Sequence, residues 1–183
     1  MNVKPLIEPL AIQQRVQELA AQIARDCAGP VVLVGILTGA ARFMMDLLAA
    51  LPESVCDRID YDFIGAASYA GQKSTGEIRI TLETAVELQG RDVLLVDGIA
   101  DSGLTLSRVR RYVEDKSPRS VKTCVLLDKP ARRLYEIKLD YVGFQIEDIF
   151  VVGYGLDADQ HGRSLHYIGT PIGTPIGTAD GIQ

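Results

Sequence analysis

Two patterns alternate along the chain: compact apolar runs, and longer segments in which apolar residues recur every three or four positions. The runs are rich in β-branched residues, which is typical of strands buried on both faces of a parallel sheet. They cover residues 31–37, 93–96 and 121–127. The longer segments predict amphipathic helices at residues 7–24, at 41–51, and after the second run, where Leu106, Val109 and Val113 form the inner stripe of a helix that ends before Pro118.

Residues 59–67 and 77–83 alternate apolar and polar side chains, so they predict two strands paired as a hairpin. The polar segment between them contains two glycines and is expected to be an exposed loop. Shorter strands are predicted at residues 140–144 and 150–152. Strands that alternate with helices in this way predict an α/β domain with a mainly parallel central sheet flanked by helices.

Such sheets bind ligands at the carboxyl ends of their strands. The loops after Ile36, Val96 and Leu127 are therefore the places where a functional site is expected. The segment 169–183 repeats the sequence GTPI and is rich in Gly and Pro, so we expect a loosely ordered arm there.

Composition narrows the class of protein. The chain has 183 residues, 47% of them hydrophobic, and a formal net charge of −5, which fits one domain with a sizeable core and lacks a strongly basic nucleic-acid footprint. No apolar run approaches the roughly 20 residues that span a bilayer, and the N-terminus lacks the apolar segment of a secretory signal. Cys27, Cys56 and Cys124 lie far apart and predict neither a disulfide framework nor a zinc site. We therefore expect a cytoplasmic protein with no membrane partner and no nucleic-acid partner.

The strongest local signal is the sequence V-D-G-I-A-D-S-G-L-T at residues 96–105, where a buried strand gives way to a helix. Backbone N–H groups at a helix start are unpaired and lie at the positive end of the helix dipole, so they suit a phosphate group. Gly103 lets the backbone approach closely, and Asp97 is placed to accept from a sugar hydroxyl or to lie near a metal ion. On the residues alone, the alternative is an ordinary N-cap in which Asp101 or Ser102 caps a helix that binds no ligand.

This segment resembles the ribose-5-phosphate loop of type I phosphoribosyltransferases, which bind phosphoribosyl pyrophosphate. Further segments, in the same order along the chain, resemble the hypoxanthine-guanine branch of that family. They correspond to its first loop and helix, its active-site flap and its purine-recognition segment, and they cover residues 34–48, 62–77, and 126–130 together with 140–163.

The resemblance implies a type I phosphoribosyltransferase-like fold with a small hood and a flexible hairpin flap at about residues 68–77. The domain would cover residues 1–168 and the tail residues 169–183. It also implies a function in purine salvage: transfer of the 5-phosphoribosyl group from phosphoribosyl pyrophosphate to hypoxanthine or guanine, which gives IMP or GMP plus pyrophosphate. The implied cofactor is Mg²⁺, and the implied assembly is a homodimer or homotetramer.

The resemblance further assigns a role to individual residues. Asp101 would act as the general base near N7 of the purine. The 5′-phosphate and ribose would be bound by Asp97, Gly98, Ser102, Gly103, Leu104 and Thr105. The remaining groups would be the purine contacts Lys129, Phe150, Val151 and Asp157, the pyrophosphate contacts Thr38, Gly39 and Arg163, the flap residues Ser68 and Tyr69, and the metal-binding residues Asp157 and Asp97.

Three positions depart from the usual pattern of the family. The family carries two adjacent acids after the strand, whereas this chain has Asp97-Gly98 and so lacks one carboxylate. Thr38 stands where a lysine is usual, which removes a positive charge near the pyrophosphate, and Ser102 replaces the commoner threonine but keeps the hydroxyl. Because charge-assisted contacts are the stronger kind, we predict weaker binding of phosphoribosyl pyrophosphate than in a typical member, and a gain of affinity in Gly98→Asp.

Two other interpretations compete with this one. Residues 153–158 match the dinucleotide fingerprint G-x-G-x-x-A, but no amphipathic helix follows them, so we reject a dinucleotide site. A nucleotide-binding or regulatory protein that kept the fold with little or no turnover would account for the missing charges at Gly98 and Thr38. The simultaneous presence of Asp101 and Lys129 with the other base-recognition groups favours an enzyme. The sequence does not decide among hypoxanthine, guanine and xanthine.

Overall fold

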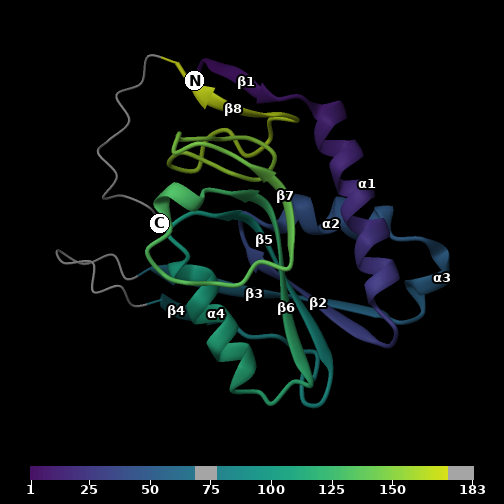
Figure 1. The fold of residues 1–183 in the computed structure, drawn as a ribbon. Helices are drawn as coiled ribbons and strands as arrows, with labels where there is room; N and C mark the ends of the chain where they lie inside the picture. Colours follow the sequence, from purple (N-terminus) through teal and green to yellow (C-terminus); the bar gives the residue numbers. More distant parts are fainter. Residues whose placement is uncertain (69–77, 173–183) are drawn as a thin grey trace.

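The three long apolar runs form neighbouring strands at the centre of one sheet (Figure 1). The computed structural model describes residues 1–68 and 78–172. The runs become β2 (Val31–Leu37), β5 (Asp92–Ala100) and β6 (Ser120–Asp128), which pair in parallel. Most of their side chains are buried because helices cover both faces of the sheet, and their sequences are therefore continuously apolar rather than alternating.

The other strands extend this sheet on both sides, in the order β4-β3-β2-β5-β6-β7. Strand β3 (Ile59–Ser68) runs parallel to β2 and β7 (Tyr141–Gln145) runs parallel to β6, whereas β4 (Ile78–Leu82) runs antiparallel to β3. The predicted α/β class and the predicted antiparallel pair are confirmed. The rest of the predicted flap, residues 69–77 with Tyr69, lies outside the described residues, and Ser68 is the last residue of β3.

Helices cover the two faces of the sheet. Helices α1 (Pro9–Asp26) and α2 (Ala41–Ala50) lie on one face, and α4 (Leu104–Glu114) lies on the other (Figure 1). Fully buried side chains such as Phe43 and Val109 anchor them, and each buried apolar side chain of this size stabilises the fold by about 1.5–3 kcal/mol. Two further helices are short: α3 (Glu53–Cys56), which precedes β3, and the 3₁₀ helix η1 (Pro130–Arg132), which follows β6.

A second, two-stranded sheet forms the small hood over the carboxyl ends of the main strands (Figure 1). It pairs β1 (Val3–Ile7) antiparallel with β8 (Ile168–Pro171), so segments from opposite ends of the described chain lie side by side. The loops between β7 and β8 lie beneath it, held by an isolated bridge between Val152 and Gly169.

Three expectations from the sequence are wrong in this region. The first helix begins at Pro9, whose fixed φ suits the first turn of a helix, and not at residue 7, which belongs to β1. Residues 150–152 form no strand, because only Val152 finds a partner. The segment expected to be a loose arm begins inside a strand, since Gly169–Pro171 belong to β8.

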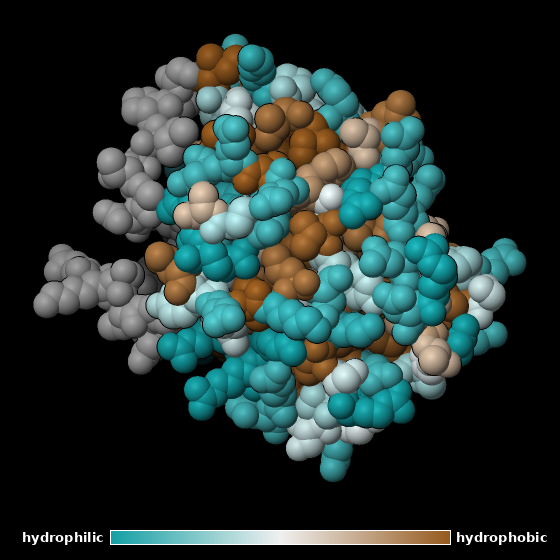
Figure 2. Space-filling view, viewed as in Figure 1, coloured by the Kyte–Doolittle hydropathy of each residue, from teal (hydrophilic) through white to brown (hydrophobic). Residues whose placement is uncertain are grey.

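The surface fits a protein whose apolar residues are largely internal. In Figure 2 most of the visible face is hydrophilic, and hydrophobic residues reach the surface in separate patches toward its centre and upper part. None of the helices in residues 1–68 and 78–172 is long and apolar enough to cross a membrane.

Candidate active site

Three loops that the sequence places far apart meet at the carboxyl ends of the central strands, and glycines allow the contact. A Cβ atom added at Gly98, near the end of β5, would lie 2.9 Å from the carbonyl oxygen of Gly39, which follows β2. A Cβ atom at Gly155, where φ is +98°, would lie 2.7 Å from the same oxygen. The predicted pyrophosphate loop, ribose loop and purine loop are therefore in direct contact around the Gly39 carbonyl.

This contact changes the expectation for Gly98→Asp. An aspartate at this position would press its Cβ against the Gly39 carbonyl oxygen and come within 3.2 Å of the Leu156 side chain. The loop that carries Thr38, whose peptide bond with Leu37 is cis, would have to move. Glycine at position 98, where the family has an acid, thus allows the predicted pyrophosphate loop to approach closely. A change of affinity in Gly98→Asp would therefore reflect the displaced loop as well as the added charge.

Asp97 lies at the same strand end without a cationic partner among the described residues. Its carboxylate oxygen Oδ1 accepts a hydrogen bond from the N–H of Gly98 at 2.7 Å. Burial raises the pKa of Asp97 to about 7, while the backbone N–H groups of Gly98 and Ile99 oppose the shift. A carboxylate that is costly to ionise in the free protein gains most from a nearby cation or from hydroxyl donors of a ligand.

The start of α4 is open rather than capped. Its N-cap residue is Gly103, with φ at +86° and no side-chain cap, so neither Asp101 nor Ser102 holds the N-cap position. The Ser102 hydroxyl oxygen lies 3.4 Å from the N–H of Leu104, at the long end of hydrogen-bond distances. Neither Asp101 nor Ser102 is therefore the N-cap residue, although Ser102 accepts from the first N–H of α4 at this long distance, and the following N–H groups of the first turn remain available to an anion.

Asp101 belongs to a small cluster of charges that joins the β5 and β6 loops. Its Oδ1 oxygen lies 3.2 Å from Nε of Arg132, and the other side of the same guanidinium lies 3.5 Å from Oδ1 of Asp148. Lys129 is 3% exposed. Burial lowers the pKa of Lys129, the charge of Asp101 raises it and the charge of Arg132 lowers it again. The predicted general base and the predicted purine-binding lysine thus lie within each other's electrostatic influence.

A second ion pair organises the loop after Phe150, whose ring is half-buried. Nη2 of Arg163 lies 2.8 Å from Oδ1 of Asp157, and Nη1 of the same arginine donates to the Gly155 carbonyl at 2.8 Å. The second carboxylate oxygen of Asp157 accepts the N–H of Gln160 at 2.7 Å. A predicted pyrophosphate contact and a predicted metal contact are therefore paired with each other, and both oxygens of Asp157 are in use.

No protein-only metal centre is formed by the described parts of the chain. Within residues 1–68 and 78–172, no three His, Cys, Asp or Glu side chains gather as a ligand set. Asp97 nevertheless suits a hard cation, because Mg²⁺ is commonly held by one or two carboxylates together with substrate phosphate oxygens and water. Asp157 suits direct ligation less well, since the ion pair with Arg163 would have to open first.

Three residues of this region were not predicted from the sequence: Arg132, Arg133 and Asp148. Their only signal was a pair of consecutive arginines just after the LLDKP segment.

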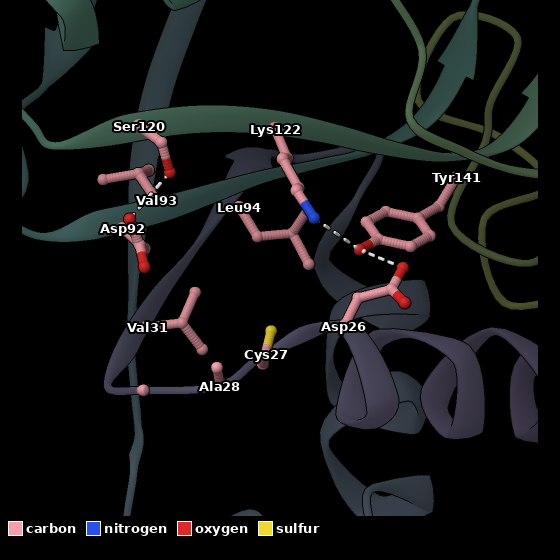
Figure 3. A pocket seen from close by; sticks show the side chains of 11 residues that line it. Asp26, Cys27, Ala28, Val31, Asp92, Val93, Leu94, Ser120, Lys122 and Tyr141 are labelled. Carbon is pink, nitrogen blue, oxygen red and sulfur yellow. Dashed lines mark hydrogen bonds between the residues drawn. The ribbon is translucent and has the colours of Figure 1, made fainter.

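The main cavities lie elsewhere. One, of about 180 Å³, opens at the amino ends of the strands between Cys27, Lys122 and Tyr141 (Figure 3).

Comparison with known proteins identifies the family of the chain. A family model for the phosphoribosyl transferase domain matches residues 6–159. The hypoxanthine-guanine phosphoribosyltransferase of Aquifex aeolicus is 41% identical over 168 residues, which cover 90% of this chain and 92% of that protein. The hypoxanthine phosphoribosyltransferase of Escherichia coli K12 is 40% identical over 175 residues, 93% of this chain and 96% of that protein.

A solved structure agrees as well. The crystal structure of a hypoxanthine-guanine phosphoribosyltransferase from Bacillus anthracis, with a HEPES molecule in its active site, superposes with a TM-score of 0.86 at 37% identity and covers 93% of this chain and 100% of that one. The predicted fold class and resemblance are confirmed. The chain belongs to the phosphoribosyltransferase family, in its hypoxanthine-guanine branch.

Proposed function

We propose that this protein transfers the 5-phosphoribosyl group of phosphoribosyl pyrophosphate to hypoxanthine or guanine, with Mg²⁺ as cofactor. The observation that carries the proposal is the junction of two loops. The N–H of Lys129 donates to the carbonyl of Ala100 at 3.0 Å, so the proposed base-binding loop is fixed directly to the proposed phosphate-binding loop. A base held by the first loop and a ribose phosphate held by the second would be presented to each other by a short, rigid connection.

The charges around this junction suit the reaction. Displacement of pyrophosphate builds positive charge at C1 of the ribose and negative charge on the leaving group. Bound Mg²⁺ would neutralise the leaving group and orient its oxygens, with Asp97 as the protein ligand that fits it. Arg163 and the Thr38-Gly39 backbone would bind the pyrophosphate at the side of the site where Gly39 contacts Gly98 and Gly155.

The purine would be recognised and deprotonated by the cluster around Asp101. The Lys129 ammonium would donate to the oxygen at position 6, which adenine lacks, and the half-buried ring of Phe150 would stack on the base. A site built to hydrogen-bond one substrate group rejects an analogue without it, because its own polar group is then left unpaired. Asp101 would accept the proton at N7, with Arg132 holding one of its oxygens in place.

A direct assay tests the proposal. We expect nucleotide and pyrophosphate to form when the protein is incubated with phosphoribosyl pyrophosphate, Mg²⁺ and hypoxanthine or guanine, but not adenine. Parallel reactions with xanthine measure the choice among 6-oxopurines. Tight ligand binding without product, under conditions in which a known family member turns over, would favour the alternative of a regulatory nucleotide-binding protein.

Assembly and location remain predictions of the same proposal. We expect a homodimer or homotetramer, measured as molar mass by light scattering, and a cytoplasmic location, measured by fractionation of the source cells.

A further inference from the structure

The main-chain carbonyls of the proposed phosphate loop are all held from one side. The carbonyl of Ala100 accepts from Nη2 of Arg133 at 3.1 Å, and the carbonyl of Asp101 accepts from Nε of the same guanidinium at 3.1 Å. The carbonyl of the next residue, Ser102, accepts from the N–H groups of Leu134 and Tyr135 at 2.9 and 3.0 Å. Residues 133–135 therefore bind three consecutive carbonyls, and the N–H of Lys129 also donates to the first of them, that of Ala100.

The orientation of these carbonyls determines where the N–H groups point. In a planar trans peptide the C=O and N–H bonds point in opposite directions. The N–H groups of Asp101, Ser102 and Gly103 are therefore aimed away from residues 133–135, and none of the hydrogen bonds among the described residues is donated by them. Successive N–H groups that face one way form an anion-binding nest.

The guanidinium that holds this arrangement is itself fixed. Arg133 forms an ion pair with Asp128, and the two side chains are only 17% and 16% exposed. Its Cδ would lie 2.9 Å from a Cβ added at Gly103, so the arginine side chain also packs behind the turn. The planar fork of arginine presents several donors at once, which a lysine ammonium on a flexible stem does not match.

We propose that Arg133 is a positioning residue for the 5′-phosphate: it orients the peptide groups of residues 100–102 so that their N–H groups face the phosphate. It does not contact the phosphate itself, because it lies on the carbonyl side of the loop. This inference rests on the proposed function for the identity of the anion, and it adds a residue outside the set assigned by resemblance.

The test compares affinities for IMP and inosine, which differ only in the phosphate. We expect the wild type to bind IMP far more tightly than inosine in calorimetric titrations. Arg133→Ala should reduce this ratio at least tenfold, because hydrogen bonds to a charged group are strong, and it should change the affinity for inosine by no more than about threefold. A purely structural role would weaken both ligands together or leave the ratio unchanged, and either result would overturn the inference.

Two further variants make the result unambiguous. Arg119→Ala removes another arginine–aspartate ion pair, more exposed and formed with Asp92 at the other end of the sheet, and should leave the ratio as in the wild type. If Arg133→Ala does not fold, as judged by circular dichroism, Arg133→Lys is evaluated by the same ratio, with a loss of at least about threefold expected and an unchanged ratio contradicting the inference. A wild type that binds IMP no better than inosine would contradict the proposed function instead.

Discussion

Strand β5 carries two aspartates, five residues apart, whose pKa values are shifted in opposite directions by their surroundings. Asp92 begins the strand, where the Arg119 guanidinium and the Ser120 hydroxyl lower its pKa to about 2. Asp97 lies near the other end, where burial raises its pKa to about 7 and only backbone N–H groups oppose the shift. Side chains of this chain pair with the first carboxylate, whereas the second has only backbone N–H partners among the described residues.

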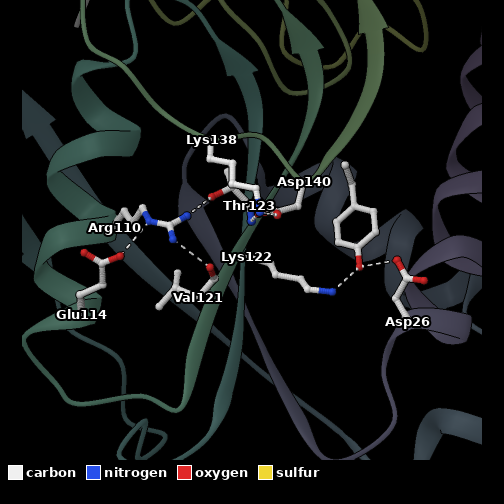
Figure 4. A network of polar contacts seen from close by, with 9 residues as sticks. Asp26, Arg110, Glu114, Val121, Lys122, Thr123, Lys138 and Asp140 are labelled. Atoms are coloured by element: carbon white, nitrogen blue, oxygen red, sulfur yellow. Dashed lines mark hydrogen bonds and ion pairs between the residues drawn. The ribbon is translucent and has the colours of Figure 1, made fainter.

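The same contrast extends across the two ends of the sheet. At the amino ends, Nζ of Lys122 donates to the Tyr141 hydroxyl at 3.2 Å, and that hydroxyl donates to Asp26 at 2.9 Å (Figure 3); Figure 4 shows Lys122 and Asp26 within the wider polar network. At the carboxyl ends, an uncapped helix start and a buried lysine lie beside each other. One end is arranged for stability, and the other keeps polar groups incompletely paired, which is typical of functional sites.

The largest expected effect comes from Gly103, which follows β5. It is compared with Gly90, which precedes β5 and also has a positive φ. Gly103→Ala would place a Cβ 2.5 Å from the Tyr135 carbonyl oxygen, so the turn must move and the proposed phosphate nest with it. We expect activity to fall at least about 100-fold, with a strain cost of about 1–3 kcal/mol. The measurements are kcat/KM and the free energy of unfolding in urea.

The matched control is Gly90→Ala at the amino end. Gly90 also has a positive φ, of +69°, but nothing lies within 4 Å of an added Cβ. It should lose about 1 kcal/mol of stability and keep full activity. Equal losses of activity in the two variants would contradict the distinction between the two ends.

The next effect separates the two aspartates directly. Asp97→Asn should weaken binding of phosphoribosyl pyrophosphate in the presence of Mg²⁺ about 10- to 100-fold, because it removes the charged partner of the ligand. Asp92→Asn should leave that affinity within about twofold and cost about 1 kcal/mol of stability, as expected for a partly exposed ion pair. Titration calorimetry and urea unfolding give the two quantities, and a loss of affinity in Asp92→Asn would break the comparison.

A further effect is on stability rather than on activity, and concerns its dependence on pH. Since folding raises the pKa of Asp97 from 3.8 to about 7, the folded state holds its proton longer than the unfolded state, and stability declines as pH rises from about 4 to 7. Asp97→Asn should therefore be more stable than the wild type by about 4 kcal/mol at pH 8, or roughly 8–16 °C in Tm. The gap should close near pH 4 in thermal melts, and a constant gap would contradict this account.

The smallest effect is expected in the network at the amino ends. Tyr141→Phe removes the hydroxyl that joins Lys122 to Asp26 and should cost about 1 kcal/mol, as for a typical hydrogen bond. Activity should not change, because the carboxyl ends of the strands lie at the opposite side of the sheet. Steady-state kinetics beside urea unfolding measures both, and a fall in kcat/KM would show that the two ends are coupled.

The sequence determined the central sheet because its strands are buried on both faces. Continuous apolar runs mark β2, β5 and β6, and the alternation of strands with helices gives their parallel order. The V-D-G-I-A-D-S-G-L-T segment located the loop that opens α4, because glycine and small polar residues at a strand end have few other uses. The fold class followed from these local signals, and the family from the resemblance of several separated segments, in the same order, to the phosphoribosyltransferases.

Tertiary structure alone decided how the pieces meet. Pairing of β1 with β8 joins residues more than 160 positions apart, and the contact between Gly39 and Gly98 joins two loops. No local pattern specifies a contact between residues distant in sequence. The raised pKa of Asp97 and the hydrogen bonds from Arg133 to the loop before α4 were likewise hidden, because desolvation and hydrogen bonding depend on which atoms surround a group after folding.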